Sequence, residues 1–177
     1  MRHFLQCAAL VMLVFVAHTI SAAPSDFGPG PVIKGFGQIA DVPNAESIPK
    51  DMVIKMAYDV REGGVDAEVN KTFNSTAGLI NSLVDAGVGQ ERIKLALVIH
   101  GPAYRDILND SAYGGQNPNV ALVEQLLNNG VDIYFCGQAA VYRDVAPEDL
   151  IPGIKLSLSA SAAHAVLQMQ GYAVRPY

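Results

Sequence analysis

The chain has 177 residues, and its 12 Lys and Arg against 17 Asp and Glu give a formal charge of −5. This length suits one domain that buries a hydrophobic core. The acidic balance argues against a nucleic-acid partner, because binding a phosphate backbone needs clustered cations. Half of the residues are hydrophobic and 16% are charged, which excludes a wholly disordered chain.

The first 23 residues have the pattern of a secretory signal peptide. Arg2 and His3 precede an uncharged run over residues 4–17, and small residues follow at 21–23. A transmembrane anchor is the alternative, but the apolar stretch is shorter than the roughly 20 residues that a span needs. We expect residues 1–23 to be cleaved and the mature protein to be exported, to a periplasm or to the extracellular space.

Residues 24–49 form a segment rich in Pro and Gly. This density of breakers excludes a long helix and weakens strand pairing. The glycines lack both a preceding strand and the spacing of a dinucleotide-binding loop. We expect an extended arm that is laid on the domain or partly loose.

From residue 50 onward, strand-like and helix-like segments alternate. Strands are predicted at residues 52–58, 93–99, 131–135, 154–158 and, as a short last strand, 172–174. Strands joined by helices favour right-handed parallel crossovers. We predict one α/β domain over residues 50–177, a flavodoxin-like three-layer sandwich with a mainly parallel sheet of about five strands. The pattern does not determine the strand order.

Three helices of this domain are predicted from periodicity and from caps. Apolar residues three or four positions apart predict a helix over residues 73–84, closed by Gly87. Asn119 can cap a second helix that ends at Gly130, and Ser159 can cap a third. These helices are expected to cover the sheet.

Candidate chemistry lies where two predicted strands end, because ligands of parallel sheets bind outside the carboxyl ends of the strands. The strand over 93–99 and the strand over 131–135 both run into polar residues and glycines. The candidate site residues at these ends and on a nearby loop are His100, Gly101, Tyr104, Asn117, Cys136, Gly137 and Gln138.

Cys136 is the candidate nucleophile. Cys7 leaves with the signal peptide, so the mature chain has a single thiol and no intramolecular disulfide. A thiol at the start of a helix faces unpaired N–H groups, which favour the thiolate, and Gly137 allows a partner backbone to approach closely. A buried, unreactive cysteine fits the same spacing.

The histidines and acids have functional and purely structural interpretations. His100 could lower the pKa of the thiol or move its proton, or it could simply be hydrogen-bonded at a strand end. His164 is expected in a surface or packing role, and Asp59 with the acids that follow it in a solvated loop. The mature chain has no pair of His and Cys residues at the spacing of a zinc site, so neither a metal nor another cofactor is expected.

The segment around Cys136 resembles the DsrE-like family, which includes sulfur-relay subunits of the Tus and Dsr type. The run GVDIYFCGQAAVYRDV, residues 130–145, is similar to the cysteine segment of that family. The likeness continues in ILN and NPN before the second helix and in GIKLSLSASAAHAVLQMQGY near the C-terminus, and it covers about residues 50–177. The resemblance implies an α/β sandwich, often a trimer or hexamer, in which Cys136 accepts sulfane sulfur as a persulfide and passes it to another thiol.

The leading hypothesis is an exported DsrE-like domain that binds or transfers sulfane sulfur through Cys136, with a thiol protein or a small sulfur compound as donor or acceptor. Export departs from the cytoplasmic relay members, because an exposed thiol outside the cytoplasm is open to oxidation. Two alternatives remain: a non-catalytic assembly module with a buried Cys136, and a thiol redox sensor. Aromatic residues around Tyr134, Phe135 and Tyr142 predict contacts between subunits.

Overall fold

The computed structural model describes residues 26–65 and 68–176. The predicted signal peptide, residues 1–23, lies outside the described residues. The described chain folds around a five-stranded sheet with every strand pair parallel and the order β4-β3-β2-β1-β5. The strands are β1 Ile54–Val60, β2 Ile93–Ile99, β3 Asp132–Cys136, β4 Lys155–Ser157 and β5 Ala173–Pro176.

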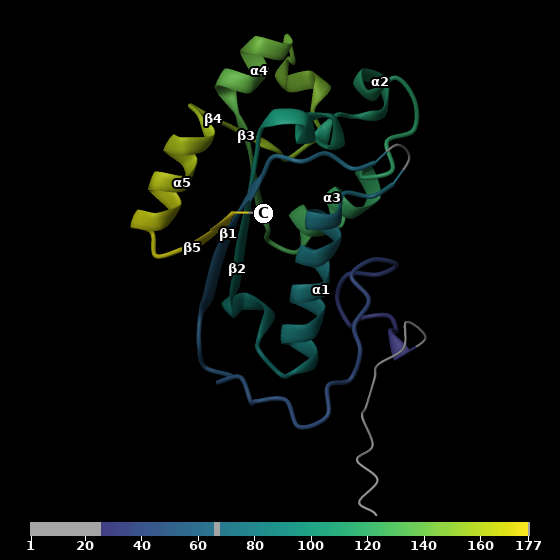
Figure 1. The fold of residues 1–177 in the computed structure, drawn as a ribbon, viewed down its shortest axis with the longest axis vertical. Helices are drawn as coiled ribbons and strands as arrows, with labels where there is room; N and C mark the ends of the chain where they lie inside the picture. Colours follow the sequence, from purple (N-terminus) through teal and green to yellow (C-terminus); the bar gives the residue numbers. More distant parts are fainter. Residues whose placement is uncertain (1–25, 66–67, 177) are drawn as a thin grey trace, which may run out of the picture.

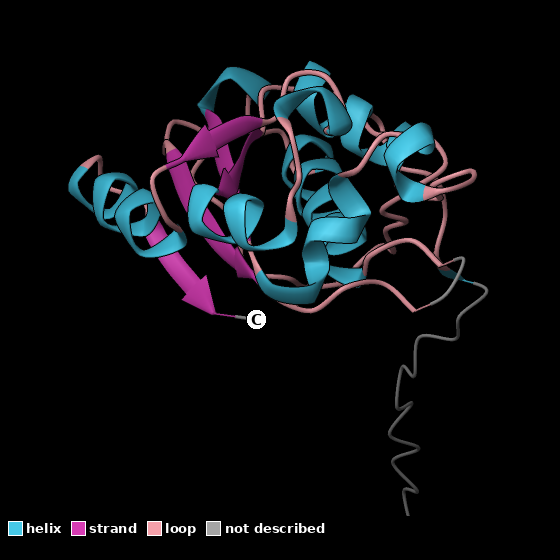
Figure 2. Cartoon of the chain, turned by 90° about the horizontal axis from the view of Figure 1, so that it is seen from above, coloured by secondary structure: helices cyan, strands magenta, loops and turns pink. Residues whose placement is uncertain are grey.

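Helices cover both faces of this sheet, so the predicted three-layer α/β sandwich is confirmed. The α-helices are α1 Lys71–Asp85, α2 Asp110–Tyr113, α3 Val120–Asn128, α4 Gly137–Arg143 and α5 Ala160–Met169. The 3-10 helices are η2 Gln90–Arg92, η3 Gly101–Ile107 and η4 Pro147–Asp149. Helix α5 lies against one face of the sheet, and α1 and α3 lie against the other (Figures 1 and 2). None of the helices in the described ranges has both the length and the apolar character needed to cross a membrane.

The sheet separates two apolar clusters of unequal size. The larger cluster fills the space under α1 and α3 and includes Phe73, Leu97 and Phe135. The smaller one, under α5, is built largely from small side chains such as Ala57 and Ala96. Strand β2 is buried along nearly its whole length because both faces are covered, as its almost continuous apolar sequence predicts.

Of the two predicted N-cap residues, Ser159 caps its helix with its side chain and Asn119 does not. Ser159 caps α5 as predicted, since its hydroxyl accepts a hydrogen bond from the N–H of Ala162. Asn119 precedes α3, but its side chain makes no cap bond to that helix. Its Oδ1 instead accepts a bond of 2.8 Å from the N–H of Asn70, so the predicted local cap is a tertiary link.

The described part of the Pro/Gly-rich arm, residues 26–49, is laid on the domain and runs beside α1 (Figure 1). Ile33 from this arm is fully buried in the larger cluster. The buried Asn81 side chain of α1 forms hydrogen bonds with main-chain groups of Val32, Ile33, Phe36 and Gly37. The arm and the α/β domain therefore share one core.

Candidate functional site

The strand order brings the two predicted strand ends together. Strands β2 and β3 are neighbours, and their last register pair is Ile99 with Phe135. One step further along each chain stand His100 and Cys136, on strands whose spacing is about 4.8 Å. On the other side of β3, Cys136 pairs in register with Ser157 of β4. The predicted proximity of the two strand ends is therefore confirmed.

Cys136 is the last residue of β3 and directly precedes α4. Helix α4 lies at the top of the molecule in Figure 1. It forms no disulfide with any described residue, and it is 7% exposed in the single chain. The structure thus combines the position expected of a reactive thiol with the burial expected of a structural one.

Gly137 and Gln138 tie the start of α4 to the segment after β4. A Cβ atom on Gly137 would stand 2.5 Å from the carbonyl oxygen of Ser157, so the close backbone approach predicted at this glycine is found. The Gln138 side chain donates a hydrogen bond of 3.3 Å to the carbonyl of Leu158. Both residues line a groove of about 570 Å³, here called the α4 groove, whose walls include Val141 and Leu158.

A second groove contains a cluster that the sequence interpretation missed. The Nε2 atoms of His100 and His164 both lie 2.8 Å from the same oxygen, Oδ1 of Asp59. These three residues, here called the His–Asp–His cluster, line a groove of about 590 Å³ together with Ser161 and Gln168 from α5. One structural interpretation needs correction, because Asp59 belongs to β1 rather than to a solvated loop. His164 packs between α5 and the sheet and donates a hydrogen bond to the Asp59 carboxylate.

Both missed residues had a signal in the sequence. Asp59 continues the alternation of β1, on the same face as Ala57, but the predicted strand stopped one residue short of it. His164 follows Ala163 on α5 and lies three residues before Leu167, both of which are buried. This spacing puts the imidazole beside the buried stripe of the helix.

The other predicted site residues make contacts within the fold. Tyr104 stacks with Arg143, whose guanidinium carbon is 4.3 Å from the ring centroid, and so connects η3 to α4. Gly101 has a φ of 56°, which favours glycine. Asn117 is buried, and its amide donates a bond of 2.7 Å to the carbonyl of Leu108. Asn117 lines neither groove, so the structure assigns it to the loop rather than to a pocket wall.

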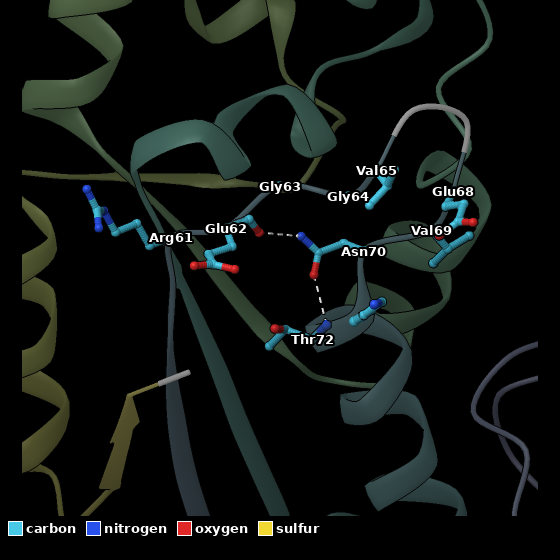
Figure 3. A pocket seen from close by; sticks show the side chains of 10 residues that line it. Arg61, Glu62, Gly63, Gly64, Val65, Glu68, Val69, Asn70 and Thr72 are labelled. Carbon is cyan, nitrogen blue, oxygen red and sulfur yellow. Dashed lines mark hydrogen bonds between the residues drawn. The ribbon is translucent and has the colours of Figure 1, made fainter.

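A smaller pocket of about 290 Å³ lies in the connection between β1 and α1 (Figure 3). At its centre, Asn70 accepts from the N–H of Thr72 and donates to the carbonyl of Glu62. Asn70 also donates a bond of 2.6 Å to Oδ2 of Asp106. Glu62 and Glu68 are exposed at this pocket, as the prediction of a solvated acidic loop requires. The Asn70 side chain thus serves to close the loop.

The buried Asp106 in this region is expected to make stability depend on pH. Burial raises the pKa of its carboxyl, against the lowering effect of bonds from Asn70 and Gly64. A raised pKa in the folded chain contributes stability that is present below the ordinary pKa of about 4 and is lost as pH rises through the folded value. Asp106→Asn keeps an acceptor oxygen and does not titrate. Unfolding measured at pH 3 and at pH 7 should show that this variant gains stability relative to the unmodified protein as pH rises; an unchanged difference would contradict the expectation.

Across residues 26–65 and 68–176, no three His, Cys, Asp or Glu side chains are arranged to hold a metal ion. In the His–Asp–His cluster, both rings are directed at one carboxylate oxygen. The cluster is therefore a hydrogen-bonded unit, and its chemistry is that of proton donors and acceptors.

Comparison with known proteins identifies the family. The sequence pattern of the DsrE/DsrF-like family matches residues 57–174. Among solved structures, the fold is similar to the ychN protein of E. coli, with a TM-score of 0.53, 18% identity and coverage of 70% of this chain and 99% of that chain. It is also similar to MTH1491, a protein of unknown function from Methanobacterium thermoautotrophicum, with a TM-score of 0.51, 17% identity and the same coverage. No curated protein sequence matches. Since the family pattern spans most of the domain, the chain belongs to the DsrE/DsrF-like family.

Proposed function

We propose that this protein carries sulfane sulfur as a persulfide on Cys136. The observation that carries the proposal is the position of a thiol without a disulfide, at the carboxyl edge of a parallel sheet and at the start of a helix. Ligands of parallel sheets bind at this edge of the sheet. The family membership of the segment that contains Cys136 supports the same role.

The proposed reaction needs neither a cofactor nor an external oxidant. The Cys136 thiolate attacks the outer sulfur of a donor persulfide or polysulfide. One S–S bond forms as another breaks, and the donor thiolate leaves with the electron pair. Passing the sulfur to an acceptor thiol repeats the exchange in the opposite direction. The donor and acceptor are thiol proteins or small sulfur compounds.

The burial of Cys136 limits how such donors reach it. At 7% exposure in the single chain, the thiol is open only to small or linear donors, or to larger ones after local movement. The α4 groove starts at Gly137, the next residue, and offers an approach from that side. Burial also suits the proposed export of the protein, because a covered thiol is oxidised more slowly than an open one.

We also propose that the protein assembles as a homo-oligomer. Phe135 is fully buried and is not available to another subunit, whereas Tyr142 is 85% exposed. Val141, the residue before Tyr142, and Leu158 are also exposed, and both line the α4 groove. Contact between copies through this apolar surface would place a second chain close to Cys136. A monomer at all concentrations in sedimentation measurements would contradict this proposal.

The low exposure of Cys136 favours a second candidate, a non-catalytic assembly module in which the thiol only packs. The two functions differ in the reactivity of the native protein. A module is labelled by thiol reagents only when it is unfolded, whereas a carrier is labelled in the folded state. A third candidate, the redox sensor, would form a reversible sulfenic acid or an intermolecular Cys136 disulfide in mild peroxide.

The carrier function predicts that the folded protein gains the mass of one sulfur atom after treatment with inorganic polysulfide. Peptide mass spectrometry should locate the added sulfur on Cys136, and dithiothreitol should remove it. Cys136→Ser is the control and should show no gain at that peptide. Absence of a gain in the unmodified protein, or an added sulfur located elsewhere in both proteins, would overturn the proposal.

A further inference from the structure

The His–Asp–His cluster joins three separate elements through one oxygen atom. Asp59 lies on β1, His100 follows β2, and His164 lies on α5. A carboxylate only accepts hydrogen bonds, so both histidines must present a protonated Nε2 to Oδ1 of Asp59. The shared oxygen therefore fixes the tautomer of both rings.

His164 is held in this cluster as a donor and has no free basic nitrogen. Its Nδ1 atom is buried and has no hydrogen-bond partner among the described residues. A proton on that atom would be an N–H buried without an acceptor, which is costly. The geometry therefore favours His164 with an unprotonated, enclosed Nδ1, and leaves it only the bond to Asp59.

His100 has a second ring nitrogen, Nδ1, that the bond to Asp59 does not use. Its Nε2 is engaged by Asp59, so Nδ1 carries the lone pair. The preceding residues of the two strands, Ile99 and Phe135, pair in register and face the larger core. Since successive side chains alternate, His100 and Cys136 occupy adjacent positions on the opposite face, under α5.

We propose that Asp59 and His164 are positioning residues that hold His100 as the base for the Cys136 thiol. This inference rests on the proposed carrier function and deepens it. His164 fixes the carboxylate from the α5 side, and the carboxylate fixes the orientation and the tautomer of the His100 ring, as in other Asp–His pairs. Neither residue contacts the reacting sulfur, so both act through His100.

The proton balance of the transfer follows from this arrangement. His100 Nδ1 takes the proton of the Cys136 thiol, and the thiolate attacks the outer sulfur of a donor persulfide. A Cys136–sulfur bond forms, the S–S bond of the donor breaks, and the donor thiolate takes the proton back from His100. The imidazole is restored, and the donor leaves as a thiol.

The test is the rate of alkylation of Cys136 by iodoacetamide in the folded protein, followed at the Cys136 peptide from pH 5 to pH 9. This rate reports the thiolate fraction. Relative to the unmodified protein, His100→Gln and Asp59→Asn should each slow alkylation at pH 7 by at least ~10-fold and move the profile to higher pH. Arg61, whose side chain lies against Gly101, and Arg143, which stacks on Tyr104, are charged groups near this edge and are unchanged in these variants.

His164 offers a matched pair of variants. His164→Gln keeps a side-chain N–H for Asp59, whereas His164→Leu does not. The Gln variant should retain most of the rate and the pH profile, and the Leu variant should resemble Asp59→Asn. Thermal unfolding of each variant shows whether the fold is intact. A folded Leu variant with an unchanged profile would overturn the role of His164.

The outcomes separate this inference from the carrier function. If Asp59→Asn still acquires one sulfur from polysulfide after long incubation, but more slowly, both proposals hold. If it acquires sulfur at the unmodified rate with an unchanged pH profile, the positioning role is wrong and the carrier function stands. If the unmodified protein acquires none, the carrier function itself fails. Alkylation that is independent of pH in all the proteins would report only local opening of the fold, and would overturn the positioning role.

Discussion

Asn81→Ala is expected to lower the free energy of unfolding by about 3 to 5 kcal/mol, because this one buried side chain forms five hydrogen bonds with main-chain groups of the N-terminal arm. Its Oδ1 accepts from the N–H groups of Val32 and Ile33 at 3.0 and 2.8 Å. Its Nδ2 donates to three carbonyls, the shortest bond being 2.9 Å to Gly37. Alanine would leave these main-chain groups without partners in a site closed to water.

Chemical denaturation measures this loss, and hydrogen exchange locates it. Amides of residues 32–37 should exchange much faster in the variant. Amides of β2 exchange only on global unfolding, so their exchange should speed up only by the amount that the lower global stability explains. Asn74→Ala is the matched control, since Asn74 lies on the same helix but is exposed and accepts one bond, from Gly37. It should cost about 1 kcal/mol. Equal losses in the two variants would show that the arm does not depend on Asn81.

Gly137→Ala is expected to destabilise the fold by about 2 to 3 kcal/mol and to expose Cys136. The added Cβ would stand 2.5 Å from the Ser157 carbonyl oxygen and 3.4 Å from that of Leu158. Both atoms are main chain and cannot rotate away, so β4 must move from the start of α4. Because Ser157 pairs in register with Cys136, this movement loosens the packing beside the thiol.

The measurements are chemical denaturation and the alkylation rate of Cys136 in the folded protein at pH 7. The variant should be less stable and should alkylate faster than the unmodified protein. Gly28→Ala is the control, since no atom lies within 4 Å of a Cβ built there, and it should change stability by less than about 0.5 kcal/mol. Unchanged stability together with an unchanged alkylation rate in Gly137→Ala would contradict the expectation.

Much of the candidate site could be located from local sequence, because each part depends on a short segment. The apolar run of β3 leads directly into Cys136 and the glycine after it. The run of β2 leads in the same way into His100. The local pattern could not decide whether the thiol is exposed, since its burial depends on Ser157 and other residues distant in the chain.

Polar residues were harder to interpret than apolar ones. Asn119 has the sequence position of a helix cap, yet its side chain binds Asn70. Asp59 resembles the exposed acids that follow it, yet it accepts bonds from two histidines. A polar side chain forms a hydrogen bond only where a partner lies at the right distance and angle. For Asn119 and Asp59, those partners come from elements that are far apart in the sequence.

The sequence by itself determined the order of strands and helices, the parallel α/β class and the family, because periodicity, breakers and the cysteine segment are local properties. Only the tertiary structure decided the strand order, the packing of the arm against Asn81 and the hydrogen bonds that join Asp59, His100 and His164. These features depend on which strands become neighbours and on how α5 packs across them. The contact between Asp59 and His164, for example, joins residues 105 positions apart, a separation that no local pattern encodes.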